Sequence, residues 1–269
     1  MKKYFVVSDV HSFFDELMTA LNNAGFEKDN PDHVLCVCGD LFDRGDGTVA
    51  LFAFVKDLAE KNRFIYVRGN HEDLLFDCME EIERGCTPSR HHLHNGTVKT
   101  ICQFCEENEW IIYDREYRRT IIKTMQPILD FISTYSVDYA EIGDCILVHG
   151  WIPEKPNKDV PLWDMSKDLY DSDWRNAGDY DWESARWLNG MREWKRGIRE
   201  EEKTIICGHW HCSYGWSHIR QERKEWPPKS GKDWLKSFEP FVDEGIIAID
   251  ACTAYSGKIN CVVLEVTDE

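Results

Sequence analysis

Five short apolar runs recur along the chain, and each is four or five residues long. They are rich in β-branched residues, which is typical of strands that are buried on both faces of a sheet. The first three are about thirty residues apart, the usual length of a strand–helix–strand unit. The pattern therefore predicts an α/β fold. The runs lie at residues 4–7, 34–38, 64–67, 145–148 and 204–207.

A helical period appears in the segments between these runs. Apolar residues recur every third or fourth position, as they do in helices with one buried face. Residues 86–96 lack this period and are expected to form a loop, and the two helices that follow are expected to form a cap. The expected helices cover residues 15–23, 48–62, 74–83, 98–107 and 117–135.

Residues 151–202 have weak periodicity and many acidic residues, and they hold six of the eleven tryptophans. We expect this segment to be long and largely irregular. Residues 244–249 and 259–266 are expected to be strands that form a hairpin-like pair in a second sheet. The resulting organisation is a single domain over residues 1–269, with a cap-like insertion at about 76–141 and a Trp-rich cleft segment at about 151–202.

Polar residues with the chemistry of metal ligands follow the five apolar runs, in the blocks SDVH, GDLFDRG, RGNHED, VHG and GHWH. Ligands of open α/β sheets gather at the carboxyl ends of the strands, so these blocks are expected to meet at one edge. Carboxylate, imidazole and amide oxygen hold divalent ions in open sites, as in two-metal hydrolases. The candidates are Asp9, His11, Asp40, Asn70, His71, His149, His209 and His211.

Composition narrows the class of protein further. Hydrophobic residues make up 42% of the 269 residues, as in globular proteins, and no apolar stretch approaches the roughly 18 residues that cross a membrane. We identify no targeting segment. The eleven irregularly spaced cysteines favour reduced thiols and a cytoplasmic location over a disulfide scaffold. A net charge of −17 disfavours long nucleic acid as a substrate.

Taken together, these blocks resemble those of the calcineurin-like metallophosphoesterases. GDLFDRG with GNHE resembles more narrowly the phosphoprotein-phosphatase branch, which includes bacterial and phage serine/threonine phosphatases and dinucleoside-tetraphosphate hydrolases. The resemblance covers residues 1–75 almost continuously and returns at 142–152 and 203–266. It implies a β-sandwich of mixed sheets flanked by helices, with a dimetal site at the carboxyl ends of strands and a helical cap insertion.

The resemblance also implies a ligand set for two divalent ions. Manganese is expected, with iron, zinc and cobalt as alternatives. Asp40 would bridge the two ions. The branch usually has one histidine where this chain has GHWH, so His211 is expected to add a ligand to the first ion or, alternatively, to support a ligand or face the substrate. Trp210 is expected to point away into packing. The implied ligands are Asp9 and His11 for the first ion, and Asn70, His149 and His209 for the second.

By the same resemblance, three residues act on the substrate. His71 would be the general acid, and Asp43 would orient its ring. His71 follows Asn70 on an expected extended turn, so the two side chains should point apart. Arg44 would bind phosphate with its planar fork, the alternative being a surface salt bridge. A second phosphate-binding arginine is expected between the late histidine blocks, with Arg186 as the candidate and Arg175 as the alternative.

The expected function is therefore that of a metal-dependent phosphoester hydrolase in which a dinuclear metal-hydroxide attacks a phosphomonoester. A serine/threonine protein phosphatase-like enzyme is the first choice, acting on a phosphorylated protein or a small phosphoester. Dinucleoside polyphosphate hydrolase and phosphodiesterase or nuclease are the alternatives. A non-catalytic interaction protein is disfavoured because the ligand set is whole and both His71 and Asp43 are present.

Overall fold

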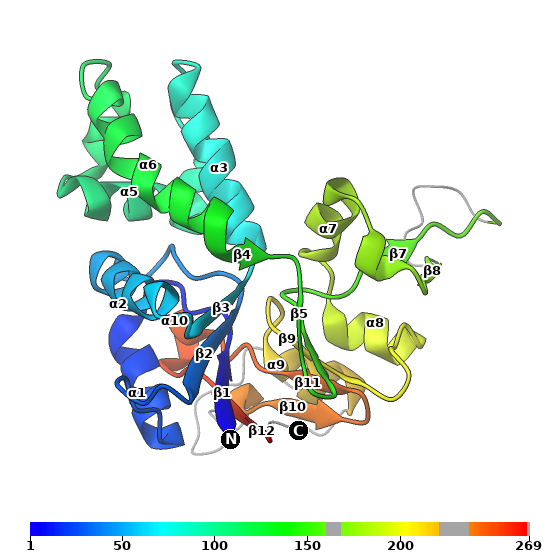
Figure 1. Cartoon of the computed structure of the whole chain (residues 1–269). Helices are drawn as coiled ribbons and strands as arrows, with labels where there is room; N and C mark the ends of the chain where they lie inside the picture. The colour runs from blue at the N-terminus through cyan, green and yellow to red at the C-terminus, as the bar shows by residue number, and fades with distance from the viewer. Residues whose placement is uncertain (160–167, 221–236, 268–269) are drawn as a thin grey trace.

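Two mixed five-stranded sheets form the body of the chain, for which a computed structural model describes residues 1–159, 168–220 and 237–267. In the first sheet, of order β12-β1-β2-β3-β4, the last four strands are parallel and β12 is antiparallel to β1. Figure 1 shows this sheet beside the second one. Its strands are β1 (Lys2–Val7), β2 (His33–Cys38), β3 (Phe64–Val67), β4 (Ser136–Val137) and β12 (Val262–Val266).

The second sheet has the order β10-β11-β9-β6-β5. Its centre is parallel, because β9 runs alongside both β6 and β11, and antiparallel strands close both edges. Among the described helices, none is long and apolar enough to cross a membrane. The strands are β5 (Ala140–Ile142), β6 (Cys145–Leu147), β9 (Thr204–Cys207), β10 (Phe241–Asp243) and β11 (Ile246–Ala248).

Strand β2 shows why the two sheets lie face to face. All six of its residues are buried, and successive side chains point to opposite faces. Leu35 and Val37 join the core beneath the helices, whereas Cys36 and Cys38 join the core between the sheets, with Leu147 and Ile206 of the second sheet. The C-x-C pair thus lies on one face, as alternation predicts.

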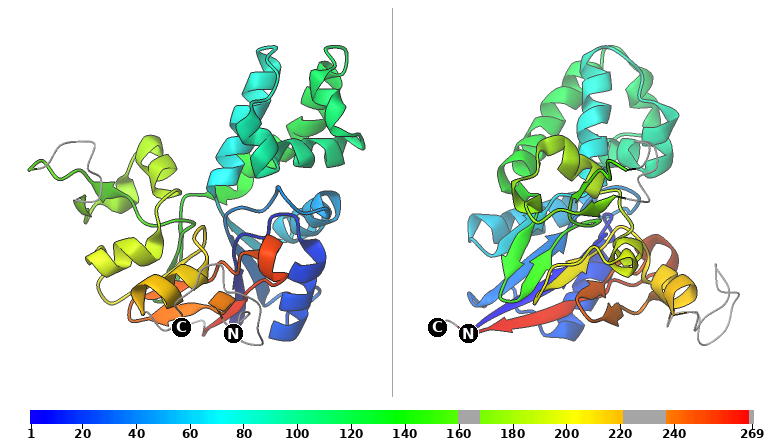
Figure 2. Two further views of the ribbon diagram at one scale, coloured as in Figure 1. Left: turned by 180° about the vertical axis from the view of Figure 1, so that it is seen from behind. Right: turned by 90° about the vertical axis from the view of Figure 1, so that its right-hand side faces the viewer.

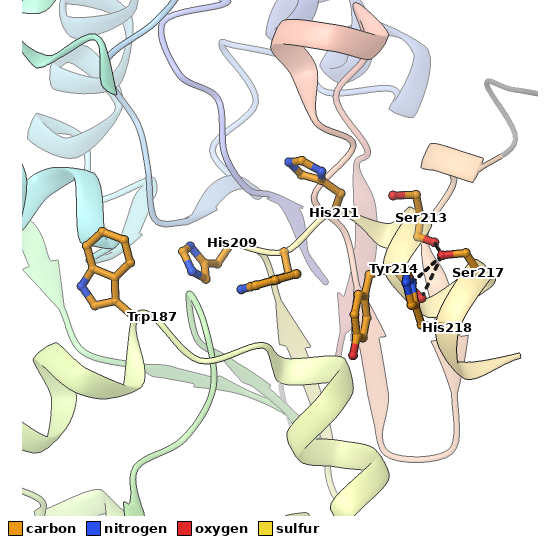
Figure 3. A pocket seen from close by; sticks show the side chains of 8 residues that line it. Trp187, His209, His211, Ser213, Tyr214, Ser217 and His218 are labelled. Atoms are coloured by element: carbon orange, nitrogen blue, oxygen red, sulfur yellow. Dashed lines mark hydrogen bonds between the residues drawn. The ribbon is translucent and has the colours of Figure 1, made fainter. Parts of the chain in front are cut away.

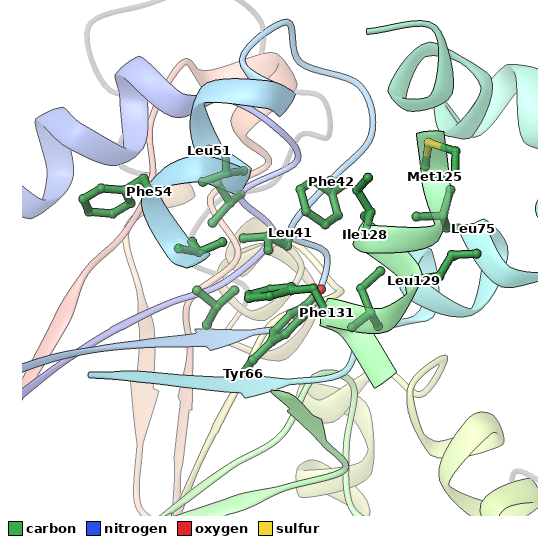
Figure 4. Close-up of a cluster of buried hydrophobic side chains, with 14 of the residues drawn as sticks. Leu41, Phe42, Leu51, Phe54, Tyr66, Leu75, Met125, Ile128, Leu129 and Phe131 are labelled. Carbon is green, nitrogen blue, oxygen red and sulfur yellow. The ribbon is translucent and has the colours of Figure 1, made fainter. Parts of the chain in front are cut away.

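Helices cover the outer face of the first sheet, where the core includes side chains of α2 and α6 together with Tyr66 of β3 (Figure 4). Helix α6 runs unbroken through Pro127. Helices α3, α5 and α6 project together beyond the edge of the sheet (Figures 1 and 2). The helices are α1 (Phe14–Ala24), α2 (Thr48–Glu60), α3 (Asn70–Glu83), α4 (Arg90–Asn95), α5 (Thr97–Cys105) and α6 (Arg118–Tyr135), with a 3-10 turn, η1 (Glu109–Tyr113), before α6.

Two of the helix predictions need correction. The expected loop at 86–96 contains helix α4, which ends at Gly96 with a left-handed φ of 91°. The sequence did not predict this helix because Leu93 is the only apolar residue of α4, so the segment shows no helical period. Helix α3 begins at Asn70 rather than at residue 74, which places Asn70 and His71 in a first helical turn and not on an extended turn.

The predicted hairpin of the last two strands is also wrong. Strand β11 pairs with β9 and β10 in the second sheet, whereas β12 returns to the first sheet and pairs with β1, Lys2 facing Val266. The right-hand view of Figure 2 shows β1 and β12 side by side. Residues 249–261, with the short helix α10 (Thr253–Ser256), carry the chain from one sheet to the other.

The Trp-rich segment is less irregular than expected and mainly covers the second sheet. Four of its tryptophans, Trp151, Trp174, Trp182 and Trp194, belong to the buried core there, and Trp163 lies outside the described residues. Trp187 is 45% exposed. The segment contains β7 (Glu154–Lys155), β8 (Leu169–Tyr170), η3 (Trp174–Asn176), α7 (Asp179–Ala185) and α8 (Gly190–Arg196).

Candidate metal centre

The polar blocks after β1, β2, β3, β6 and β9 converge into two groups of possible ligands that share one carboxylate. His11, Asp40 and His71 form the first group, and Asp40, His149 and His209 form the second. Within each group the ligand atoms lie within 4.8 Å of one another. Parallel pairing explains this convergence, because the carboxyl ends of aligned strands end at one edge.

Asp40 turns one oxygen toward each group. Its Oδ2 lies 3.5 Å from His11 Nε2 and 3.9 Å from His71 Nε2, whereas Oδ1 lies 3.3 Å from His149 Nε2. Burial raises the pKa of the Asp40 carboxyl, and the neighbouring histidines His149 and His71 oppose this. A carboxylate so placed has one oxygen for each of two cations.

Two of the histidines have the ring orientation that metal ligands require. His11 Nδ1 lies 2.9 Å from the carbonyl of Phe42, and His149 Nδ1 lies 2.8 Å from the carbonyl of Cys38. An N–H at Nδ1 donated to a carbonyl leaves the Nε2 lone pair directed at Asp40, which is how protein groups orient metal-bound imidazoles. The donor set therefore fits two divalent ions held by nitrogen and oxygen.

Asn70 completes the second group. Its Oδ1 lies 2.9 Å from His149 Nε2, the same nitrogen that faces Asp40 Oδ1. His209 approaches from the other side, its ring centroid 5.1 Å from that of His149. Its backbone N–H donates to Asp9 Oδ2 at 3.0 Å, so the block after β9 is tied to the block after β1.

The ligand loops adopt a backbone conformation that non-glycine residues rarely use. Asp9, His11, Asp40, Asp43 and His209 all have φ between 48° and 75°. Such left-handed residues cost free energy and concentrate at functional sites. A Cβ at Gly39, Gly69 or Gly208 would overlap a candidate ligand side chain, which explains why glycine precedes the ligands in GD, GN and GH.

Glu72 holds the ligand loops together, although sequence reasoning gave it no role. Its buried carboxylate accepts hydrogen bonds from the backbone N–H groups of Asp40 (3.0 Å), Leu41 (2.9 Å) and Gly69 (2.7 Å). Glu72 is the third residue of α3, where a carboxylate caps the first turn. The block GNHED contains this glutamate, but its capping role can be recognised only when the helix is known to begin at Asn70.

His71 is paired with Asp43, as the resemblance implied. His71 Nδ1 lies 2.7 Å from Asp43 Oδ2, and both side chains are almost fully buried. Burial lowers the pKa of His71, but the Asp40 and Asp43 carboxylates outweigh burial and hold this pKa above its usual range. Asp43 also accepts hydrogen bonds from Thr97 (2.9 Å) and Thr100 (2.7 Å) of α5, two residues that sequence reasoning missed.

Arg44 spans the first group. Its Nη1 lies 2.9 Å from His11 Nε2, and its Nη2 lies 3.1 Å from His71 Nε2. A guanidinium only donates, so both ring nitrogens face it as acceptors. The fork therefore lies directly at the candidate metal site rather than in a surface salt bridge.

His211 lies at the margin of the centre. Its Nε2 is 3.9 Å from Asp250 Oδ2, and its side chain is 35% exposed. Asp250 is buried, and burial together with Asp9 raises its pKa well above the usual range. The prediction for Trp210 was wrong, because its side chain is 42% exposed. Strand β9 ends at Cys207 and His209 has a left-handed φ of 62°, so strand alternation does not extend to Trp210.

The two candidate clamping arginines pair with carboxylates. Arg186 bonds Asp73 Oδ2 at 3.0 Å and Asp138 Oδ1 at 2.7 Å. Arg175 bonds Glu141 and Glu200, each at 2.7 Å. Both arginines are thus held in ion pairs, and a phosphate-binding role for Arg186 stays a prediction.

The two mixed sheets, their flanking helices and the clustered ligands are typical of a metallophosphoesterase fold. Comparison with known protein families supports the same assignment. The chain belongs to the calcineurin-like phosphoesterase family, which matches residues 2–243, and it is therefore a hydrolase. The expected α/β fold of mixed sheets flanked by helices is thereby confirmed.

Curated relatives match a shorter segment. The asymmetrical bis(5'-nucleosyl)-tetraphosphatase PrpE of Bacillus velezensis is 37% identical over 79 residues, covering 27% of this chain and 32% of that protein. A symmetrical bis(5'-nucleosyl)-tetraphosphatase of Psychromonas ingrahamii is 40% identical over 68 residues, covering 25% and 23%. The matched segments thus span about a third or less of the length of these relatives.

Solved structures with similar folds include a putative diadenosine tetraphosphatase, with a TM-score of 0.48 at 13% identity over 98% of this chain and 89% of that one. A serine/threonine phosphatase from Saccharomyces cerevisiae with similarity to human PP5 has a TM-score of 0.46 at 16% identity, over 100% of this chain and 81% of that one.

Proposed function

We propose that this chain is a dinuclear-metal hydrolase that cleaves the phosphoanhydride bonds of dinucleoside polyphosphates. The observation that carries the metal chemistry is Asp40, whose two oxygens face two separate groups of histidines. Two divalent ions, when bound, would activate water and neutralise phosphoryl oxygens. Manganese is our first choice, and the mixed nitrogen and oxygen ligands also suit iron, zinc and cobalt. The residues that would hold the ions are Asp9, His11, Asp40, Asn70, His149 and His209, with His211 as a further ligand.

His71 would protonate the leaving phosphate oxygen. Its Nδ1 is held by Asp43, and its Nε2 faces the shared space beside Arg44. The raised pKa of His71 favours a proton on Nε2, as a general acid requires, once Arg44 turns from that nitrogen to the phosphate. Arg44 would bind the phosphoryl oxygens with its fork. Helix α5, which belongs to the proposed cap, holds Asp43 through Thr97 and Thr100.

The choice of substrate rests on two supports. Both kinds of curated relative are bis(5'-nucleosyl)-tetraphosphatases. Among the residues that the structure describes, the cavity beside His209 and His211 is lined by aromatic, histidine and serine side chains and by no lysine, arginine or carboxylate. Such a wall suits an uncharged ring more than the varied side chains of a protein substrate.

A serine/threonine phosphatase activity on a phosphorylated protein, our first choice from sequence, is the second candidate. It is favoured by the His71–Asp43 pair together with Arg44, which suit a phosphomonoester equally well. We also propose a cytoplasmic location, because all eleven cysteines are free thiols.

A substrate panel tests the proposal. The manganese-loaded protein would be given a dinucleoside tetraphosphate, a phosphoserine peptide, a phosphate bis-ester and a mononucleotide. We expect the largest kcat/KM for the dinucleoside tetraphosphate. A larger kcat/KM for the phosphopeptide would replace our proposal with the second candidate, and hydrolysis of the bis-ester alone would indicate a phosphodiesterase.

A further inference from the structure

One cavity opens directly beside the candidate metal centre. Its volume is about 570 Å³, within the range of about 300–1,000 Å³ that small-molecule sites occupy. Two candidate ligands, His209 and His211, form one side of it, so a group in the cavity lies next to the phosphate that the metal centre would hold. The lining residues are Trp187, His209, Trp210, His211, Ser213, Tyr214, Ser217 and His218.

Aromatic rings dominate this cavity. Trp187 and Trp210 are 45% and 42% exposed, although most tryptophans of the neighbouring segment are buried. Trp187 meets His209 edge-on with ring centroids 5.7 Å apart, and Trp210 meets Tyr214 in the same way at 5.4 Å. Figure 3 shows Trp187 beside His209, and Tyr214 further along the cavity. Rings that are exposed in a cavity offer flat surfaces on which another ring can stack.

At the end of the cavity farther along the chain, the described lining residues are polar and include no lysine, arginine or carboxylate. Tyr214 stacks on His218 with centroids 4.6 Å apart and planes at 14°, and Ser217 Oγ lies 2.7 Å from His218 Nδ1. Hydroxyl and imidazole groups can both donate and accept hydrogen bonds, as the edge of a heterocyclic base requires. Flat rings for the faces and uncharged polar groups for the edge are the two features that a nucleobase needs.

We propose that this cavity binds the nucleobase of the substrate, with Trp210 and Tyr214 as stacking rings. The proposal rests on the proposed function and adds the residues that would select a nucleotide. The described lining holds no lysine, arginine or carboxylate, although charged residues make up 30% of the chain. A free phosphate or a sugar phosphate would gain nothing from these rings.

Binding of two probes separates the base from the phosphate. Adenosine monophosphate and ribose 5-phosphate would be titrated into the manganese-loaded protein by calorimetry. We expect the nucleotide to bind at least about tenfold more tightly, because stacking on aromatic side chains contributes that much or more. Tyr214→Leu should lower the nucleotide affinity about tenfold and leave ribose 5-phosphate unchanged, whereas Tyr214→Phe should retain it.

Trp210→Leu should act like Tyr214→Leu, and Trp110→Leu is the matched control because Trp110 is 77% exposed and outside the cavity. Circular dichroism and metal content would show that each variant is folded and loaded. Equal affinities for the two probes in the wild type would overturn the proposal, as would an equal loss of both in Tyr214→Leu. A phosphopeptide whose affinity alone depends on Tyr214 would assign the cavity to a protein substrate instead.

The two proposals fail in different ways. If the protein hydrolyses a dinucleoside tetraphosphate but the ring variants bind both probes normally, the nucleobase cavity is wrong and the activity stands. If base binding depends on Tyr214 but no dinucleoside tetraphosphate is hydrolysed, the cavity stands and the proposed substrate is wrong.

Discussion

Asp43 and Thr100 are joined by two hydrogen bonds that run in opposite directions. The backbone N–H of Asp43 donates to Thr100 Oγ1 at 3.0 Å, and the Thr100 hydroxyl donates to Asp43 Oδ1 at 2.7 Å. Both residues are buried. Helix α5, from a stretch without a recognisable motif, thereby fixes the carboxylate that faces His71.

Thr100→Val is expected to lower stability by about 1–3 kcal/mol, because it leaves the buried Asp43 N–H without its partner. It should also lower kcat several-fold and shift the acid–base limbs of the pH profile, since Asp43 would hold His71 less firmly. Urea unfolding and a kcat–pH profile measure the two effects. Thr19→Val, at an exposed threonine of α1, is the control. An unchanged pH profile in Thr100→Val would make this residue merely structural.

Asp40→Asn is expected to reduce the metal content of the loaded protein from two ions to one or none. The amide would offer one oxygen where the carboxylate offers two, and it would neutralise neither ion. Elemental analysis after loading with manganese gives the stoichiometry. Asp46→Asn is the control, since Asp46 follows in the same loop with its side chain 91% exposed. A saturated wild type with a single ion would contradict the dinuclear centre.

His71→Asn is expected to keep both metal ions and to lower kcat about a hundredfold or more, the usual scale of general acid catalysis. The loss should shrink for a nitrophenyl ester, whose leaving group needs no proton. Because His71 Nε2 also lies 3.9 Å from Asp40 Oδ2, the structure offers it as a ligand too. Loss of a metal ion in the variant would assign it that role.

Arg44→Lys is expected to lower kcat/KM at least about tenfold, because lysine keeps the charge but loses the fork that binds two phosphate oxygens. Arg186→Lys makes a matched comparison, since Arg186 is held by Asp73 and Asp138. That variant should lower thermal stability more than kcat/KM. A reversed pattern, with KM raised only in Arg186→Lys, would restore the phosphate-binding prediction for Arg186.

Glu154 gives a prediction on pH and stability outside the metal centre. Its side chain is 6% exposed beside Glu193 and Arg196, and burial, with Glu193 adding to it, raises the pKa of Glu154 to about 8 from an ordinary 4.5. The native state thus keeps a proton that the unfolded state loses. The stability contributed by this proton is full below pH 4.5 and disappears as pH rises through 8.

Glu154→Gln should therefore flatten the decline in the free energy of unfolding between those two pH values. Urea unfolding at several pH values measures this slope, with Glu60→Gln at an exposed position of α2 as the control. A slope equal to that of the wild type in Glu154→Gln would show that the carboxyl ionises freely in the folded protein.

The sequence predicted those parts of the structure that follow from local pattern. Strands β3 and β9 have the expected bounds because each is a short apolar run that ends at a polar block. The meeting of Asp40 with His11 and His149 followed from parallel strands ending at one edge. The local sequence pattern does not indicate which distant strand a given strand pairs with, and for this reason β12 was assigned to the wrong sheet.

Roles that depend on orientation were also beyond the sequence. Thr97 and Thr100 look like ordinary helix residues until the fold turns that face of α5 toward Asp43. Histidine adopts the left-handed region only occasionally, so the sequence did not indicate a left-handed His209 beside an exposed Trp210.

The pairing of β1 with β12 also sets an order of events during synthesis. Until residues 262–266 have emerged from the ribosome, β1 lacks its β12 partner and one of its edges stays open. The loop that follows β1 carries the candidate ligands Asp9 and His11. Open strand edges promote association with other chains, and contacts between distant residues form slowly. A nascent chain of this protein is therefore expected to need protection of that edge until residues 262–266 have emerged and paired with β1.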